Sequence, residues 1–351
     1  MGAFNAEWRR EIARTDAISS PRQQELKRWL ARIDGLDPST LASASEDASF
    51  RQYYRLKCGN STRIVMDAPP DKEDSEPFIK VAGYLEKMQL NSPRVLAADL
   101  DLGFLLLTDL GSTLYLTVLR DDRSCADRLY QDALSALVRM QRLGSEFQSD
   151  LPPYDEALLS FELSLFHDWL CERHLEIEFT EADESQWQEC CRLLIQNALQ
   201  QPKVFVHRDY HSRNLLLTDE DNPGILDFQD AVEGPYTYDL VSLLKDCYVR
   251  WPASQVKKWA MTFYGQLDDA LKNQIDPDRF MRHFELMGVQ RHLKAAGIFA
   301  RLMHRDGKSG FMLDVPRTLE YIVALGPQYE ELSFLTQLIS QRCLPALREN
   351  E

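Results

Sequence analysis

Three side chains suited to phosphate chemistry lie in one short segment, residues 203–229, with the sequence KVFVHRDYHSRNLLLTDEDNPGILDFQ. Asp209 follows a short apolar run, Asn214 comes five residues later, and Asp227 lies another thirteen residues on. The apolar residues on either side of TDEDNPG predict two strands, residues 215–217 and 225–228, joined by a turn, because TDEDNPG is rich in turn-forming residues. A hairpin returns its second strand beside the first, so we expect Asn214 and Asp227 to meet at one end.

This combination of side chains is typical of phosphoryl transfer, a reaction that depends on positioning and cations more than on covalent chemistry. Magnesium prefers oxygen ligands and keeps several waters, so one carboxylate and one amide oxygen suffice beside the phosphates of a nucleotide. We therefore expect Asn214 and Asp227 to bind Mg²⁺, and Asp209 to act as the base that orients the attacking hydroxyl. His207 is expected to brace the loop, and Arg208 to support it or to face an anion.

The pattern H-R-D-x-x-x-x-N, followed after thirteen residues by D-F, is specific. The alternative is a polar loop and hairpin with ordinary surface acids. HRDYHSRN followed by ILDFQDAVEGPYTYDLVSLL resembles the aminoglycoside phosphotransferase and choline kinase superfamily. Over residues 40–310 the resemblance implies an α+β, bilobal protein-kinase-like fold, with a small β-sheet N-lobe and a mainly helical C-lobe. It also implies ATP and Mg²⁺ as cofactors, a nucleotide between the lobes, and Asp239 as a structural anchor.

Four further stretches narrow the resemblance: SASEDASFRQYYR, IVMDAPPDKED, GFLLLTDLG and QRHLKAAGIFARLMHRDGK. They are similar to the bacterial sugar 1-kinases that phosphorylate N-acetylmuramate and N-acetylglucosamine at the anomeric hydroxyl during peptidoglycan recycling. Two alternatives stay open. One is the same chemistry on an aminoglycoside or an amino alcohol, and the other is a nucleotide-binding pseudokinase.

The expected nucleotide-binding residues depart from the kinase pattern, which has a Gly-rich loop and a strand lysine. The loop position has SASEDASFRQYYR without a glycine, and Met66 stands where the lysine is expected. Backbone N–H groups beside small residues such as Ser49 could still approach phosphate. Arg51, Arg55 and Lys80 are the cations that could replace the lysine. The linker expected to face adenine consists of Thr108, Asp109 and Leu110.

Candidates to bind the acceptor lie close to these residues. Arg213 is inside the loop, and Gln229 and Asp230 directly follow the D-F pair, although ordinary loop structure would explain them equally. Arg291 lies three residues from Lys294 on a predicted long helix. A guanidinium there would suit a muramate carboxylate, because it can bind both oxygens. The alternative for this charged pair is the solvated side of the helix.

The elements that position these residues fall into two predicted domains, residues 1–110 and 111–351. In the first, SFRQYYRL and TRIVMDA around Gly59-Asn60 predict a hairpin. PFIKVAGYLEKM predicts a helix, VLAADLDLGFLLLTDLG predicts two short strands, and residues 1–40 have a helical, polar pattern. In the second domain apolar residues recur at helical spacing, including one long helix over residues 279–303.

Composition excludes other classes of protein. The formal net charge of −15 argues against a nucleic-acid partner, which would require clustered Lys and Arg. The longest apolar runs are far shorter than the roughly 20 residues of a membrane span, and the N-terminal residues show no signal-peptide pattern. We therefore expect a cytoplasmic protein with a small-molecule substrate and no membrane partner. Seven scattered cysteines without a CxxC pair predict reduced thiols rather than disulfides or a zinc site. The pattern does not predict the oligomeric state.

Overall fold

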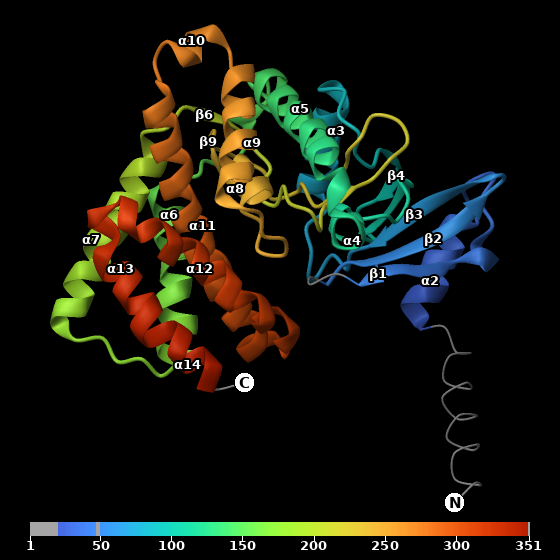
Figure 1. Ribbon diagram of the computed structural model, residues 1–351. Coiled ribbons are helices and arrows are strands. Elements are labelled where there is room, and N and C mark those ends of the chain that lie inside the picture. Colours follow the sequence, from blue (N-terminus) through green and yellow to red (C-terminus); the bar gives the residue numbers. More distant parts are fainter. Residues whose placement is uncertain (1–19, 47–49, 350–351) are drawn as a thin grey trace, which may run out of the picture. The chain divides into compact units, whose positions relative to one another are not determined.

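The computed structural model describes residues 20–46 and 50–349 (Figure 1). The described residues form two compact units. Unit 1 comprises the described part of Met1–Gly83 together with Pro93–Leu110, and unit 2 comprises Tyr84–Ser92 together with the described part of Gly111–Glu351. Within the described residues, no helix has the length and the apolar composition to cross a membrane. All seven cysteines are free thiols.

Unit 1 is built on a five-stranded antiparallel sheet with the strand order β1-β2-β3-β5-β4. Its strands are β1 Ala42–Glu46, β2 Gln52–Cys58, β3 Ser61–Asp67, β4 Val95–Asp99 and β5 Phe104–Thr108. Helix α2 (Pro21–Leu30) begins at a capping box made by Ser20 and Gln23, and it packs its apolar face on the sheet. The short η1 (Pro38–Thr40) leads into β1, and α3 (Glu76–Lys87) contributes residues to both units.

The two predicted strand pairs of unit 1 are confirmed. In the first, Cys58 pairs with Ser61 across a two-residue turn in which Gly59 has φ of +59°. In the second, β4 and β5 are joined at Gly103, which has φ of +70°. A Cβ atom at Gly103 would lie 1.9 Å from the carbonyl oxygen of Ala68, so a glycine is required for this close approach.

Unit 2 is mainly helical and is arranged around α11 (Pro277–Asp306), which confirms the predicted long helix. Along most of its length α11 is buried, and it packs against α6, η4, α7, α8 and α12 (Figure 1). The larger helices of the unit are α4 Tyr115–Asp121, α5 Ala126–Gly144, α6 Glu156–Leu165, the π-helix η4 Phe166–His174, α7 Glu181–Leu199, α8 Tyr238–Leu244, α9 Ala253–Gln266 and α12 Val315–Leu325. Shorter ones are η2 Arg123–Cys125, η3 Gln148–Asp150, α10 Asp269–Lys272, η5 Ser309–Asp314, η6 Gly326–Gln328, η7 Glu330–Leu332, α13 Ser333–Leu338, the π-helix η8 Ile339–Cys343 and α14 Leu344–Glu349.

Two small sheets interrupt the helices of unit 2. Strand β6 (Lys203–Val206) pairs with β9 (Val232–Pro235), a partner that the sequence pattern did not indicate. Strands β7 (Leu215–Leu216) and β8 (Gly224–Ile225) form the predicted hairpin. The prediction that its second strand reaches Phe228 is wrong, because Asp227 has φ of +62° and its backbone is therefore not extended. The chain turns at Asp227 instead of continuing as a strand.

Candidate active site

The segment between β6 and β7, residues 207–214, carries the H-R-D-x-x-x-x-N pattern and is called the HRD loop below. A buried carboxylate holds its start: Asp239 on α8 accepts hydrogen bonds from the backbone N–H of His207 at 2.7 Å and of Arg208 at 2.9 Å. Burial raises the pKa of Asp239 to about 7, although the two amide donors act in the opposite direction. Arg208 has φ of +77°, an unfavourable backbone conformation for a side chain of this size. Asp239 thus stabilises a strained backbone at the entrance to the loop.

The structure brings Asp209, Asn214 and Asp227 together. The side-chain amide of Asn214 donates to the carbonyl oxygen of Asp209 at 3.0 Å and to Oδ2 of Asp227 at 3.1 Å. The hairpin β7–β8 makes this contact, since Leu226 N–H donates to the carbonyl oxygen of Asn214 at 2.9 Å. Gln229, which is 9% exposed, donates to Oδ1 of Asp227 at 2.8 Å, while the neighbouring Asp230 is exposed. Gln229 therefore orients the carboxylate of Asp227.

The carboxylate of Asp209 is 40% exposed and lies among cations. Burial alone would raise its pKa, but the charges of Lys294, His211 and Arg291 outweigh burial and lower the pKa below its usual value. Nε2 of His211 lies 4.0 Å from Oδ1 of Asp209. The fully buried His207 braces the loop, because its Nδ1 accepts from the backbone N–H of Asp209 at 3.2 Å. Asp209 is consequently ionised at neutral pH.

A buried charge network next to the HRD loop was not predicted. Glu162 on α6 is 2% exposed, and its Oε1 lies 2.5 Å from the Arg208 guanidinium and 2.9 Å from Nζ of Lys294. Its Oε2 accepts hydrogen bonds from the Tyr154 hydroxyl and from Gln290. Burial would raise the pKa of Glu162, but the two cations and Tyr154 lower it overall. The one sequence signal was a glutamate inside the apolar stripe of a helix.

The solvated-side alternative for Arg291 and Lys294 is wrong, since only 6% and 8% of these residues are exposed. Lys294 is paired with Glu162, whereas Arg291 donates only a long contact of 3.8 Å to Sγ of Cys247. Nε of Arg291 is buried and has no hydrogen-bond partner among the described residues. Arg291 is thus a buried cation without a carboxylate partner in the described part of the chain, within electrostatic range of Asp209.

A second buried carboxylate, Asp246, stabilises the far part of the HRD loop. Its Oδ2 accepts from both the backbone N–H and the hydroxyl of Ser212, at 3.1 and 2.5 Å, and its Oδ1 accepts from the Tyr248 N–H at 2.8 Å. Tyr248 in turn lies against two side chains of the loop: its ring makes an edge contact with His211, and the guanidinium of Arg213 lies over it. Asp246 was also missed from the sequence, where nothing distinguishes it from a surface acid.

The residues predicted to contact the nucleotide are found in unit 1, with the exception of Ser49, which lies outside the described residues. Met66 is fully buried on β3 between Tyr53 and Leu105 of the neighbouring strands. Arg51 forms an ion pair with Glu73 at 3.1 Å, and the side chains of both are largely buried.

The linker residues also have contacts within unit 1. Asp109 accepts two hydrogen bonds from Arg55, at 2.6 and 2.9 Å, and a third from Thr62 at 2.6 Å. Arg55 is therefore held by a bidentate ion pair with the linker. Thr108 accepts from the backbone N–H of Arg94 at 2.9 Å, and Leu110 is half-buried.

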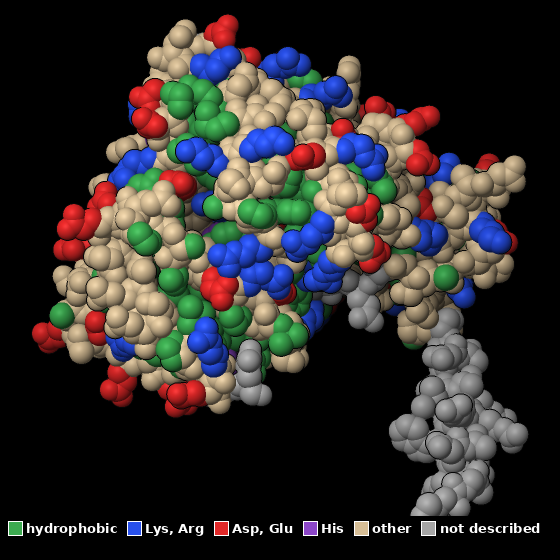
Figure 2. All heavy atoms as spheres, in the orientation of Figure 1, with side chains coloured by type: hydrophobic (Ala, Val, Ile, Leu, Met, Phe, Trp, Pro, Cys, Tyr) green, Lys and Arg blue, Asp and Glu red, His purple; other side chains and the backbone are tan. Residues whose placement is uncertain are grey.

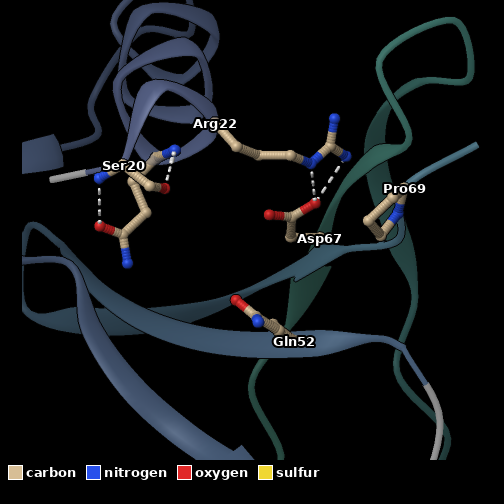
Figure 3. A pocket seen from close by; sticks show the side chains of 6 residues that line it. Ser20, Arg22, Gln52, Asp67 and Pro69 are labelled. Atoms are coloured by element: carbon tan, nitrogen blue, oxygen red, sulfur yellow. Dashed lines mark hydrogen bonds and ion pairs between the residues drawn. The ribbon is translucent and has the colours of Figure 1, made fainter.

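A pocket of about 140 Å³ lies elsewhere in unit 1, between the start of α2 and strands β2 and β3 (Figure 3). Its two charged side chains, Arg22 and Asp67, form an ion pair with each other. The guanidinium of Arg22 donates to Oδ1 of Asp67 at 2.6 Å and to the carbonyl oxygen of Leu102 at 2.7 Å. Burial raises the pKa of Asp67, and the arginine acts against this rise. The pocket contains a structural ion pair that holds α2 on the sheet, and we do not consider it a candidate active site.

A small antiparallel sheet in one unit, a mainly helical second unit and an HRD loop with a converging asparagine and aspartate define a protein-kinase-like phosphotransferase. The chain belongs to the phosphotransferase enzyme family, whose sequence pattern matches residues 40–270. It is an enzyme that acts as a kinase. The predicted family resemblance and fold class are thereby confirmed.

Curated relatives are similar over most of the chain. The N-acetylmuramate/N-acetylglucosamine kinase of Pseudomonas aeruginosa is 47% identical over 305 residues, which cover 86% of this chain and 88% of that protein. The protein of the same name from Neisseria meningitidis is 41% identical, over 91% of this chain and 95% of its own. Among solved structures, an ethanolamine kinase of Plasmodium vivax has a TM-score of 0.59 at 12% identity, and the likeness covers 83% of each chain. At this identity the structural likeness establishes the fold alone.

Proposed function

We propose that this kinase transfers the γ-phosphoryl group of ATP to the anomeric hydroxyl of N-acetylmuramate or N-acetylglucosamine, in the cytoplasm, as a step of peptidoglycan recycling. The sugar is suggested by relatives that are 41% to 47% identical and are N-acetylmuramate/N-acetylglucosamine kinases. The observation that carries the phosphoryl-transfer chemistry is the convergence of Asp209, Asn214 and Asp227 through the hydrogen bonds of Asn214.

The donor set fits a magnesium ion. Asn214 directs its Nδ2 toward Asp209 and Asp227, and no described residue donates a hydrogen bond to its Oδ1. Asp227 supplies an exposed carboxylate that Gln229 orients. These are the hard oxygen donors that Mg²⁺ prefers, so we assign Asn214 and Asp227 as its ligands. When bound, Mg²⁺ neutralises charge on the β- and γ-phosphates of the nucleotide.

Asp209 is assigned as the base. Its ionised carboxylate accepts a hydrogen bond from the acceptor hydroxyl, orients the oxygen for attack on the γ-phosphorus, and takes the proton as the new P–O bond forms and the bond from the γ-phosphorus to ADP breaks. Because the surrounding cations keep its pKa low, the main contribution of Asp209 is orientation rather than strong basicity. Arg208 is assigned a supporting role through its ion pair with Glu162, and His207 through its bond to the loop backbone.

For the nucleotide we assign Arg51 the phosphate contact that a strand lysine would make at Met66. Glu73 orients Arg51 through a largely buried ion pair, as a glutamate orients the lysine of protein kinases. Arg55 is a weaker candidate for the phosphate contact, because its guanidinium already forms a bidentate ion pair with the carboxylate of Asp109. The remaining assigned nucleotide contacts are Ser49, Met66, Thr108, Asp109 and Leu110. For the acceptor we assign Arg213, Gln229, Asp230 and Arg291.

An acceptor panel tests the proposal. The full-length protein is incubated with Mg-ATP alone, then with N-acetylmuramate, N-acetylglucosamine, choline or kanamycin, and ADP release is followed. Turnover with either amino sugar, and none with the methyl glycoside of N-acetylglucosamine, is expected, because the glycoside has no free anomeric hydroxyl. Turnover only with the cationic acceptors refutes the sugar assignment. Nucleotide binding without turnover on any acceptor favours a pseudokinase.

A further inference from the structure

Arg213 is an exposed arginine held in one place by aromatic rings. Its guanidinium lies 4.8 Å from the centre of the Tyr248 ring and 5.2 Å from that of Phe311. Both rings are themselves fixed, since each packs against Phe299 of α11. No carboxylate among the described residues forms an ion pair with Arg213. Stacking orients the planar guanidinium and leaves its N–H donors for a partner that the described residues do not supply.

The surroundings of Arg213 are cationic, although the chain as a whole carries a formal charge of −15. Arg120, Arg213 and Arg317 all act electrostatically on the carboxylate of Asp314, which is already in an ion pair with Arg317. Arg317 also donates to the carbonyl oxygen of Tyr248 at 2.9 Å. Figure 2 shows Lys and Arg side chains gathered around the region labelled α12 in Figure 1. An acidic protein that concentrates arginines at one place can attract an anion there.

A short series of contacts links Arg213 to the proposed base. The imidazole of His211 lies 4.0 Å from Asp209 on one side, and its ring contacts that of Tyr248 on the other, at 5.5 Å between centres. Tyr248 carries the guanidinium of Arg213 on its face. His211 is 9% exposed, and its buried Nδ1 has no partner among the described residues. Asp209 and Arg213 thus belong to the same loop and are connected through the contacts of His211 and Tyr248.

We propose that Arg213 binds the lactyl carboxylate of N-acetylmuramate, and so determines how strongly the enzyme prefers this acidic sugar to neutral N-acetylglucosamine. The inference rests on the proposed sugar kinase function. The two sugars differ by the lactyl ether on O3, and C3 lies two carbons along the pyranose ring from the anomeric carbon. A pre-oriented guanidinium that forms no ion pair with a described residue matches the two oxygens of that carboxylate.

The same chemistry would suit a phosphate of ATP, so the experiment measures both substrates. Arg213→Gln removes the charge, and Arg213→Lys keeps the charge but loses the planar fork and the stacking. Phe311→Leu leaves Arg213 in place but removes one of its two supporting rings. Arg348→Gln, which changes an exposed arginine on α14, is the control for net charge. For each protein, kcat/KM is determined for the two sugars and KM for ATP.

We expect Arg213→Gln to lower kcat/KM for N-acetylmuramate about tenfold and to leave that for N-acetylglucosamine within about twofold, because a bidentate charged contact is lost for one sugar only. The lysine and leucine variants fall between this value and wild type, and KM for ATP does not change. An equal loss for both sugars, no loss for either, or a raised KM for ATP alone overturns the proposal. A wild-type enzyme that turns over N-acetylglucosamine but not N-acetylmuramate also overturns the Arg213 proposal, although it supports the sugar kinase function. A wild-type enzyme that is inactive on both sugars refutes the sugar kinase function itself.

Discussion

The buried carboxylate of Glu162 offers a strong test of the charge network below the HRD loop. The change is Glu162→Gln, which keeps the shape of the side chain and an acceptor oxygen for Tyr154. It removes the negative charge that faces Arg208 at 2.5 Å and Lys294 at 2.9 Å. Only 19% and 10% of these two cationic side chains are exposed, so water cannot replace the lost partner.

Breaking a buried ion pair by removing one partner costs about 3–5 kcal/mol. Glu162 is 2% exposed and forms ion pairs with two cations, so solvent screening does not reduce this cost. We therefore expect Glu162→Gln to lower the free energy of unfolding by an amount within this range. For a unit of this size, each kcal/mol lowers Tm by roughly 2–4 °C. The free energy of unfolding is measured by urea titration with circular dichroism, and Tm by thermal denaturation.

The pH dependence gives an independent check. The pKa of Glu162 in the folded protein lies below its ordinary value of 4.5, so the carboxylate stabilises the fold above that pH. This stabilisation is lost as the pH falls through the lower folded value. The difference in unfolding free energy between wild type and Glu162→Gln therefore has its maximum value at pH 7 and decreases progressively below about pH 4.5.

Glu189→Gln is the matched control, because it makes the same chemical change at an exposed position of α7. We expect it to stay within about 0.5 kcal/mol of wild type. A Glu162→Gln protein that loses less than about 1 kcal/mol, or whose difference from wild type is unchanged at low pH, would refute the assignment of this network as a buried electrostatic support.

Three further predictions concern the proposed chemistry and the packing of α11. Asp209→Asn should bind nucleotide normally but lose on the order of 10²-fold or more in kcat, and a near-normal kcat would exclude Asp209 as the base. Asp227→Asn should raise the Mg²⁺ concentration for half-maximal activity at least about tenfold, measured by metal titration, because a charged ligand is lost; an unchanged requirement would place the metal elsewhere. Gly297→Ala should lower the free energy of unfolding, measured by urea titration, by about 1–3 kcal/mol, because its Cβ would lie 2.3 Å from the backbone of Leu165. The control Gly265→Ala should leave the free energy of unfolding unchanged, because its Cβ would have no atom within 4 Å. Equal effects of the two substitutions would contradict the packing argument.

Local sequence patterns predicted several elements of the fold. The turn at Gly59-Asn60, the strands on either side of Gly103 and the long helix α11 were all predicted, because each depends on turn chemistry or on periodicity over neighbouring residues. The pairing of β6 with β9 was not predicted, since it joins segments that are separated in the chain and leaves no local signal. Strand β8 ends earlier than predicted, because Asp227 adopts a left-handed backbone conformation that its residue type does not predict.

By itself the sequence determined the kinase-like pattern: the spacing of Asp209, Asn214 and Asp227 around a hairpin follows from chain order and turn residues. Only the tertiary structure decided which charges surround them. Glu162 and Lys294 come from different helices and are buried together beside Arg208, whereas their residue types alone indicate a solvated surface. The physical reason is that the energetic effect of a charge depends on its burial and on its partners, and both are set by packing between segments that are distant in sequence.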